Sequence, residues 1–468
     1  MSSVSAVAII LFAWLRFRER LGRSPAHLLR SVRPAPALAY AGAALLAPLF
    51  AAQAAILVLQ TRYEGAALPR GSREVLPIPV FDGRLHPPPI EALYSHVALG
   101  VGVLETLCLG IVVLAAHAGV GRRLTPLVVA VGGALAAIAL LTPAMATRDP
   151  YEYAATSMLG FAAYAPPAGA FHGTPYAPIF GRVPLRGVIY GPLWVAFDTL
   201  ELALVPAIAA KIIVLRAVNA GLVAALLLLL GRAGASRASL VSIGVNPAVW
   251  CYAVLSPHAD IEALVLLAAA MLAAQRARPW IAMVLLAAAG AVKLTFLLAG
   301  AAVLAPIAGA TRRFGLWGGA IASAAVASLL VPGNAYVHDL ISYVPYSRNL
   351  VPESSGGLWM VPAALAALAT IVLLASGRGI AAAAWLFGQL APLTAPWYLL
   401  WGFPYAQATG VLTALAVSLP LATVALDLNF HLNPIPTAVA LGCAAGFAIE
   451  VVRGYSRTNA AIVPREPA

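Results

Sequence analysis

Apolar stretches of about 20 residues recur along most of this 468-residue chain, and they constrain its fold more than any other feature. A transmembrane helix needs roughly that many apolar residues. Inside hydrocarbon, a backbone can satisfy its polar groups only within a helix or a closed barrel. The Leu- and Ala-rich run at 220–230 lacks the alternation of polar and apolar residues typical of a barrel strand. The sequence therefore predicts an all-α integral membrane protein.

The composition supports this class. Hydrophobic residues make up 62% of the chain and charged residues 10%, whereas soluble globular proteins have about 50% and 25%. The net charge of +12 arises from basic residues in short loops, as expected on the cytoplasmic side of a membrane protein. Because no nucleic-acid-binding motif accompanies these residues, we expect no nucleic-acid partner.

We expect one membrane domain over residues 36–452, a polytopic bundle of about 11–13 transmembrane helices. A short apolar segment and a basic cytoplasmic segment precede it at 1–35, and a cytoplasmic tail follows at 453–468. The helix count stays open because 188–230 and 280–308 are ambiguous, and the latter is either one helix or two, broken near Lys293 or Pro306. The predicted spans are 36–60, 95–117, 124–146, 188–206, 208–230, 238–256, 260–275, 280–308, 316–332, 358–376, 380–402, 408–426 and 435–452.

Three longer stretches differ from the basic short loops. Residues 61–94, 147–189 and 333–357 are rich in Pro, Gly and Tyr, and long loops in compact proteins are usually functional. We expect all three on the extracytoplasmic side, with helices inside the loops. Around 188–256 the predicted spans do not alternate consistently between the two sides of the membrane, so the orientation of that region stays open.

The second long loop begins with Arg148, Asp149, Pro150, Glu152 and Tyr153. A carboxylate at the mouth of a membrane helix is accessible to water and close to headgroups, and a positioned Asp can take the proton of an attacking hydroxyl. A phosphate leaving group instead needs cationic or N–H donors, which arginines of this loop supply. Alternatively, Asp149 and Pro150 only turn or cap the chain.

Further candidates follow in the chain. Tyr190 lies in a Tyr-Gly-Pro-Leu-Trp run. It is a candidate site residue, and the alternative is that the run only anchors the chain at the membrane interface. His258 and Asp260 are ionisable residues between apolar segments, which are functional by default, or else a satisfied contact between helices; they lack the further ligands of a zinc site. Lys293 either snorkels towards an interface or has a phosphate or carboxylate partner within the bundle.

The last candidates lie in the third loop and beyond it. Arg348 either clamps a donor phosphate or belongs to a solvated loop. Trp397 and Tyr398 lie in a Pro-Trp-Tyr-Leu-Leu-Trp run that ends a predicted helix. This run is typical of a membrane-interface belt, and it also suits a groove in which lipid or sugar stacks.

The order of these motifs between about residues 140 and 405 resembles the GT-C superfamily, and more narrowly the bacterial polyprenyl-phosphate-mannose-dependent mannosyltransferases. The resemblance implies an all-helical body in the bacterial plasma membrane with an extracytoplasmic site. It implies inverting transfer of a sugar, mannose by analogy, from a polyprenyl-phosphate donor to a lipid-linked or glycan acceptor. No cofactor is implied, and no divalent metal is expected, although Asp149 and Glu152 could share an ion.

Under this resemblance Asp149 occupies the position of the catalytic base, and Lys293 that of a late lysine. His258 and Asp260 match a His-Asn-Asp segment in which this chain has Ala259. The other candidate substrate-binding residues are Arg148, Glu152, Tyr153, Arg186, Tyr190, Arg348, Trp397 and Tyr398.

The competing hypotheses are a secondary transporter and a lipid flippase. A transporter needs ionisable residues within the membrane, a role open to Lys293, Asp198 and Glu201. The long loop at 147–189 fits a transporter poorly, because typical connections are far shorter.

Overall fold

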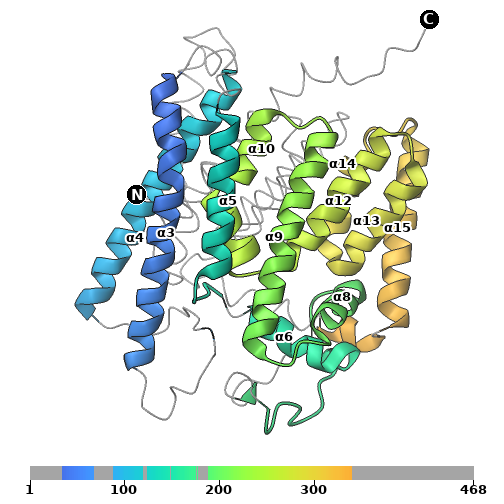
Figure 1. Cartoon of the computed structure of the whole chain (residues 1–468). Coiled ribbons are helices and arrows are strands. Elements are labelled where there is room, and N and C mark those ends of the chain that lie inside the picture. The colour runs from blue at the N-terminus through green and yellow to red at the C-terminus, as the bar shows by residue number, and fades with distance from the viewer. Residues whose placement is uncertain are drawn as a thin grey trace, which may run out of the picture.

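The computed structural model describes residues 34–67, 78, 88–119, 124–147, 149–174, 176–177, 188–331 and 333–339. Within these ranges the chain forms helices and no β-strand, as predicted (Figure 1). Three of the described helices are long and apolar enough to cross a membrane, or four if one bent pair is a single span. The spans predicted at 358–376, 380–402, 408–426 and 435–452 lie outside the described residues, so the total of 11–13 stays a prediction.

The body is a bundle of apolar helices. Helix α3 packs along α4 with Gly42 at the contact, where an added Cβ would lie 3.2 Å from the carbonyl oxygen of Cys108. Small residues allow such close backbone approach between membrane helices. The main helices are α3 (Pro36–Ala67), α4 (Pro88–His117), α5 (Thr125–Leu141), α9 (Ile208–Arg232), α12 (Asp260–Gln275), α13 (Pro279–Val292) and α15 (Ala310–Leu330).

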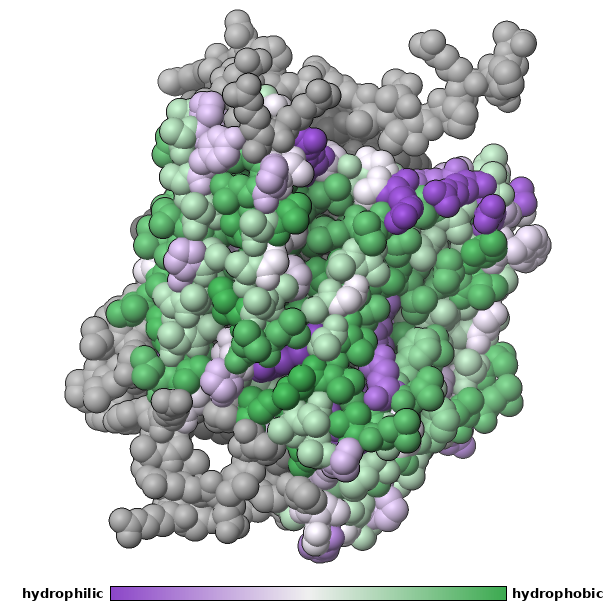
Figure 2. Space-filling view, in the orientation of Figure 1, coloured by the Kyte–Doolittle hydropathy of each residue, from purple (hydrophilic) through white to green (hydrophobic). Residues whose placement is uncertain are grey.

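The described helices are apolar outside as well as inside. Figure 2 shows hydrophobic residues over most of the visible face of the bundle. Leu141, Leu204 and Leu330 are 80%, 94% and 79% exposed. A contiguous apolar surface of this kind is unfavourable in water, so these helices suit a lipid environment.

The predicted span 238–256 is a broken helix. It divides into α10 (Arg237–Gly244), α11 (Pro247–Trp250) and a π-helical turn, η4 (Cys251–Leu255), with a bend of 52° at the break. Pro247 lacks a backbone N–H and cannot continue the α10 hydrogen bonds. The side chain of Asn246 caps the new start by accepting from the Ala248 N–H at 3.0 Å. Turns of the π type often occur at functional sites.

The predicted span 280–308 is also divided, and the break falls at Lys293 rather than at Pro306. Helix α13 ends at Val292, and Lys293 adopts an extended conformation with φ −155° and ψ 116°. The chain then continues through a 3₁₀ helix, η5 (Leu294–Ala299), and a single turn, α14 (Gly300–Val303).

The predicted span 188–206 was wrong. This region forms α8 (Pro192–Leu202), whose 11 residues extend only about 16 Å and cannot cross a hydrocarbon core of about 30 Å. Apolar composition misled the prediction, because α8 is as apolar as a span and buries Trp194, Val195 and Leu202 against its neighbours, but it is too short to cross. It lies beside α6 (Asp149–Leu159) at one end of the bundle, followed in the chain by α9 (Figure 1). Helix α6 and the 3₁₀ turn η3 (Gly160–Tyr164) are the helices expected within the 147–189 loop.

Without a span at 188–206, successive helices through 188–256 run alternately towards opposite ends of the bundle, as spans of one domain must. Asp260 at the start of α12 is paired with Lys293 just after α13, so the turn between these helices lies at the opposite end of the bundle. That far end also holds the end of α9 and the starts of α10 and α15 (Figure 1). Six arginines occupy these far-end positions: Arg232, Arg237, Arg276, Arg278, Arg312 and Arg313.

Candidate functional site

The centre of the candidate site is an ion pair between Asp149 and His258. Asp149 Oδ2 lies 3.3 Å from His258 Nε2, and the two side chains are 30% and 1% exposed. Asp149 is the first residue of α6, where the unpaired N–H groups of a helix start favour a carboxylate. The capping interpretation of Asp149 and Pro150 therefore coexists with a site role. The carboxylate remains open on one side while its partner is buried.

The contacts of His258 determine where its protons lie. Its Nδ1 lies 2.8 Å from the carbonyl oxygen of Tyr252 and 2.6 Å from that of Ser256. Carbonyl oxygens only accept hydrogen bonds, so Nδ1 carries a proton. Nε2 then faces the Asp149 carboxylate, and two acceptors cannot share this contact without a proton between them. The pair is therefore an imidazolium with a carboxylate, or an imidazole with a carboxylic acid.

The surroundings favour the ionised form of this pair. Burial lowers the pKa of His258, but the hydrogen bond and charge of Asp149 together with the charge of Asp260 outweigh it, so the net pKa is raised above its ordinary value. The imidazolium is the form that donates from both ring nitrogens. Asp149 is accordingly held as a carboxylate, the state that can accept a proton.

A second ion pair lies beside the first. Lys293 Nζ donates to Asp260 Oδ1 at 2.7 Å, and both side chains are buried. The same ammonium lies 5.3 Å from the ring centroid of Tyr190, within range of a cation–π contact. Lys293 therefore points into the bundle rather than snorkelling to an interface. His258 and Asp260, close in sequence, have different partners.

Aromatic residues form one wall of the site. The hydroxyls of Tyr153 and Tyr190 are hydrogen-bonded at 2.8 Å. The Trp194 ring lies 4.9 Å from Tyr153 and 4.5 Å from Tyr190, measured between centroids. Burial raises the pKa of the Tyr153 hydroxyl well above its ordinary value, followed by the charges of Asp149 and Asp260. The hydroxyl is therefore neutral and available as a hydrogen-bond donor.

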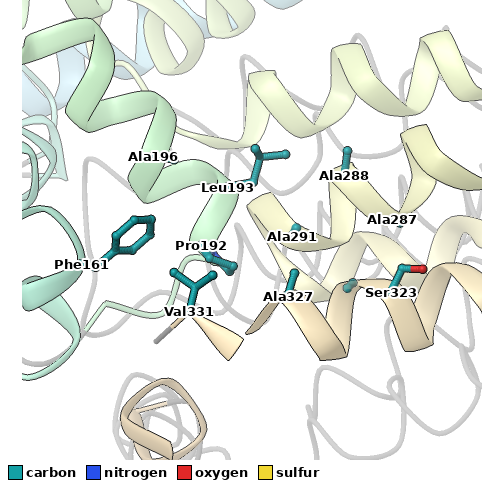
Figure 3. A pocket seen from close by; sticks show the side chains of 11 residues that line it. Phe161, Pro192, Leu193, Ala196, Ala287, Ala288, Ala291, Ser323, Ala327 and Val331 are labelled. Carbon is teal, nitrogen blue, oxygen red and sulfur yellow. The ribbon is translucent and has the colours of Figure 1, made fainter. Parts of the chain in front are cut away.

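An apolar groove of about 390 Å³ lies between α8, α13 and α15. Figure 3 shows Phe161, Pro192 and Leu193 on one side of it, facing alanines and Ser323 of α13 and α15. Pro192 and Ala291 of its lining flank the point where the Gly191 N–H donates to the Val292 carbonyl at 2.8 Å, next to Tyr190 and Lys293 in the chain. Its volume lies at the lower end of the range for small-molecule sites, about 300–1,000 Å³.

A third group of charged residues lies on α8, α9 and α12. Asp198 of α8 is 1% exposed, and neither of its carboxylate oxygens has a hydrogen-bond partner. Lys211 of α9 donates to Ser157 at 2.8 Å, and Glu262 of α12 is also buried. Among the described residues, no three His, Cys, Asp or Glu side chains are grouped so as to hold a metal ion.

The structure brings six of the predicted residues together, although they come from four segments of the chain. They are Asp149, Tyr153, Tyr190, His258, Asp260 and Lys293. Glu152 lies in the first turn of α6 and is partly buried. The other predicted residues lie outside the described ranges: Arg148, Arg186, Arg348, Trp397 and Tyr398.

Two residues of this region were missed as candidates. Trp194 enters the sequence analysis only within the Tyr-Gly-Pro-Leu-Trp motif, without a role of its own. Arg216 was not considered, although a charged residue within the apolar α9 is itself a signal of function. Comparisons with protein-family models, curated proteins and solved structures gave no match for this chain.

Proposed function

We propose that the protein is a membrane glycosyltransferase that transfers a sugar, mannose in the first instance, from a polyprenyl-phosphate donor to a lipid-linked or glycan acceptor. One observation carries the proposal. The partly exposed carboxylate of Asp149, the ammonium of Lys293 and an apolar groove lie together at one end of the bundle. A lipid phosphate sugar requires these three elements: a base for the acceptor, a cation for the phosphate and an apolar surface for the chain.

Asp149 acts as the base in this proposal. The acceptor hydroxyl oxygen attacks the anomeric carbon, and its proton passes to the Asp149 carboxylate. The bond between the anomeric carbon and the phosphate oxygen breaks, and its electron pair leaves with the polyprenyl phosphate. His258 supports this role because its Nε2, at 3.3 Å, keeps Asp149 ionised.

Lys293 stabilises the charge on the departing phosphate. In this proposal a phosphate oxygen shares the ammonium with Asp260, which accepts from it at 2.7 Å. Tyr190 keeps the ammonium in place through its ring. Arg148, Arg186 and Arg348 are proposed to add further positive charge, and Trp397 and Tyr398 to stack on the ligand.

We place the site on the extracytoplasmic side of the bacterial plasma membrane. The positive-inside rule puts short basic turns in the cytoplasm, and the six arginines lie at the opposite end of the bundle from the site. Helix α12 covers only about 24 Å of a core of about 30 Å. We therefore propose that the site is recessed below the outer surface, where a lipid phosphate could reach it.

The test is sugar transfer in membranes. Wild type, Asp149→Asn and the control Glu201→Gln are expressed at matched levels with labelled polyprenyl-phosphate mannose, with and without chelator. We expect Asp149→Asn to lose about 10²–10⁴-fold in rate, the control to retain activity, and chelator to have no effect. Equal transfer by wild type and Asp149→Asn would remove Asp149 from the mechanism.

One observation favours the alternative, a secondary transporter. The buried carboxylate of Asp198 has no hydrogen-bond partner, and intramembrane carboxylates frequently bind coupling protons. Asp198→Asn separates the two functions, because a glycosyltransferase using Asp149 retains transfer in this variant. Loss of solute uptake into proteoliposomes by Asp198→Asn, with no sugar transfer by the wild type, would instead support the transporter.

A further inference from the structure

Arg216 is a charged side chain in the middle of the apolar helix α9, and it is 2% exposed. Its guanidinium contacts backbone carbonyls. Nε donates to Leu255 at 2.9 Å, one terminal nitrogen donates to Thr142 at 2.6 Å, and the other donates to Ala144 at 2.8 Å. Burying a charge is costly unless it is hydrogen-bonded, and this arrangement meets that condition.

Two of the carbonyls that Arg216 binds lie at helix ends, and the third, that of Ala144, lies in the segment that follows α5. Thr142 follows the last residue of α5, and Leu255 is the last residue of the π-helical turn η4. The last carbonyls of a helix have no partner within it and carry its partial negative charge. One guanidinium therefore caps the C-terminal ends of both helices, which are distant in sequence.

Each capped end leads directly into one half of the candidate ion pair. The segment after α5 reaches Asp149 at the start of α6, and the segment after η4 reaches His258. Ser256 also ties the two segments together, because its hydroxyl accepts from the Ala146 N–H at 2.7 Å. The separation of the ion pair therefore depends on how these two helix ends are held.

Asn219 extends the same polar face of α9 by one turn. Its amide nitrogen donates to the carbonyl of Ala253 at 2.7 Å and to that of His258 at 3.3 Å. Arg216 and Asn219 thus contact the backbone within the η4 turn and just after it. A planar guanidinium presents its donors in a rigid fork, which a lysine cannot reproduce.

We propose that Arg216, with Asn219, is a positioning residue that sets the contact between Asp149 and His258 by capping α5 and η4 together. Neither residue touches a ligand in this proposal; both act through the backbone. The inference rests on the proposed function only for its effect on sugar transfer, because the geometry of the ion pair can be measured without any substrate.

The test is the titration of His258 in the full-length protein, in lipid nanodiscs, by NMR of labelled histidine. The signal is assigned by its loss in His258→Gln. The charged or titratable groups near the ring are Asp149 of α6, Asp260 of α12 and Tyr252 of η4. Arg216→Lys should loosen the Asp149 contact and leave burial dominant, so the midpoint should fall by about 1 unit.

The matched control is Arg232→Lys, an exposed arginine at the other end of the same helix, which should leave the midpoint unchanged. If Arg216→Lys does not fold, Asn219→Ser is measured instead. It should lower the His258 midpoint by a smaller amount. A wild-type midpoint in a folded Arg216→Lys protein, or in Asn219→Ser where the first variant does not fold, would overturn the proposal.

Sugar transfer provides a separate readout. If the protein is a glycosyltransferase, Arg216→Lys should lower kcat with little change in KM, because the donor contacts remain. Absence of transfer by the wild type would count against the proposed function alone. The titration would still decide the role of Arg216.

Discussion

Asp260 and Lys293 form a buried ion pair, with 2.7 Å between Oδ1 and Nζ, that closes one end of the α12–α13 hairpin. The pair lies where α13 breaks and the backbone of Lys293 becomes extended. This charged pair therefore has two roles. It closes the hairpin, and it presents an ammonium to the site.

The first prediction concerns the stability of this pair. Lys293→Met or Asp260→Asn alone should destabilise the protein by about 3–5 kcal/mol, because each leaves one buried group without its partner. The double variant should recover much of this loss, since no charge then remains unpaired. Thermal unfolding in nanodiscs gives the coupling energy. Additive losses in the double variant would mean that the two groups act independently.

The second prediction concerns the pH dependence of His258. Its pKa is raised above the ordinary value of 6.5, so the pair with Asp149 stabilises the protein fully below that pH and less as pH rises through the raised pKa. The free energy of unfolding of the wild type should exceed that of His258→Gln by about 1–2 kcal/mol in acid. Unfolding measured from about pH 5 to pH 9 should show this difference shrinking. A difference that grows with pH would indicate a neutral histidine.

The third prediction concerns the groove. Ala327→Phe would fill part of it, and the control Val326→Phe changes a neighbouring position that is 52% exposed. We expect Ala327→Phe to lower kcat/KM for long-chain donors about tenfold, or about 1.4 kcal/mol, with little effect on a short-chain donor. Equal losses for both donors would show that the chain binds elsewhere.

The fourth prediction concerns the contact between α8 and α13. An added Cβ at Gly191 would lie 2.1 Å from the Ala291 carbonyl oxygen, so Gly191→Ala should destabilise the protein by about 1–3 kcal/mol. Gly221, in the middle of α9, has open space around its Cβ position. Gly221→Ala should therefore stabilise by about 0.5–1 kcal/mol. Unfolding measurements on both variants check this; equal effects would contradict the packing argument.

The apolar stretches predicted the helical class and, to within one residue, the starts of α3, α5, α9, α10, α12 and α13, because length and hydropathy are local properties. They could not distinguish α8 from a span, since a short helix packed at the end of the bundle has the same composition. The break at Lys293 was one of two alternatives, and the structure selects it because the lysine must reach Asp260.

The candidate site was partly predictable for a related reason. Asp149, His258 and Lys293 each follow the end of an apolar segment, and helix ends on one side of a membrane come together. The individual pairings were not predictable, because His258 and Asp260 are only two residues apart but have different partners. Arg216 was missed because its role depends on which carbonyls its helix face meets, which only the packed structure reveals.

The close contact at Gly191 also has a dynamic consequence. The Gly191 N–H donates to the Val292 carbonyl at 2.8 Å, with no room between the backbones of α8 and α13. Two walls of the groove therefore behave as one rigid body, together with the aromatic residues carried by α8. Movement that widens the groove falls to the third wall, α15, which begins after Gly309 at a φ of 85°.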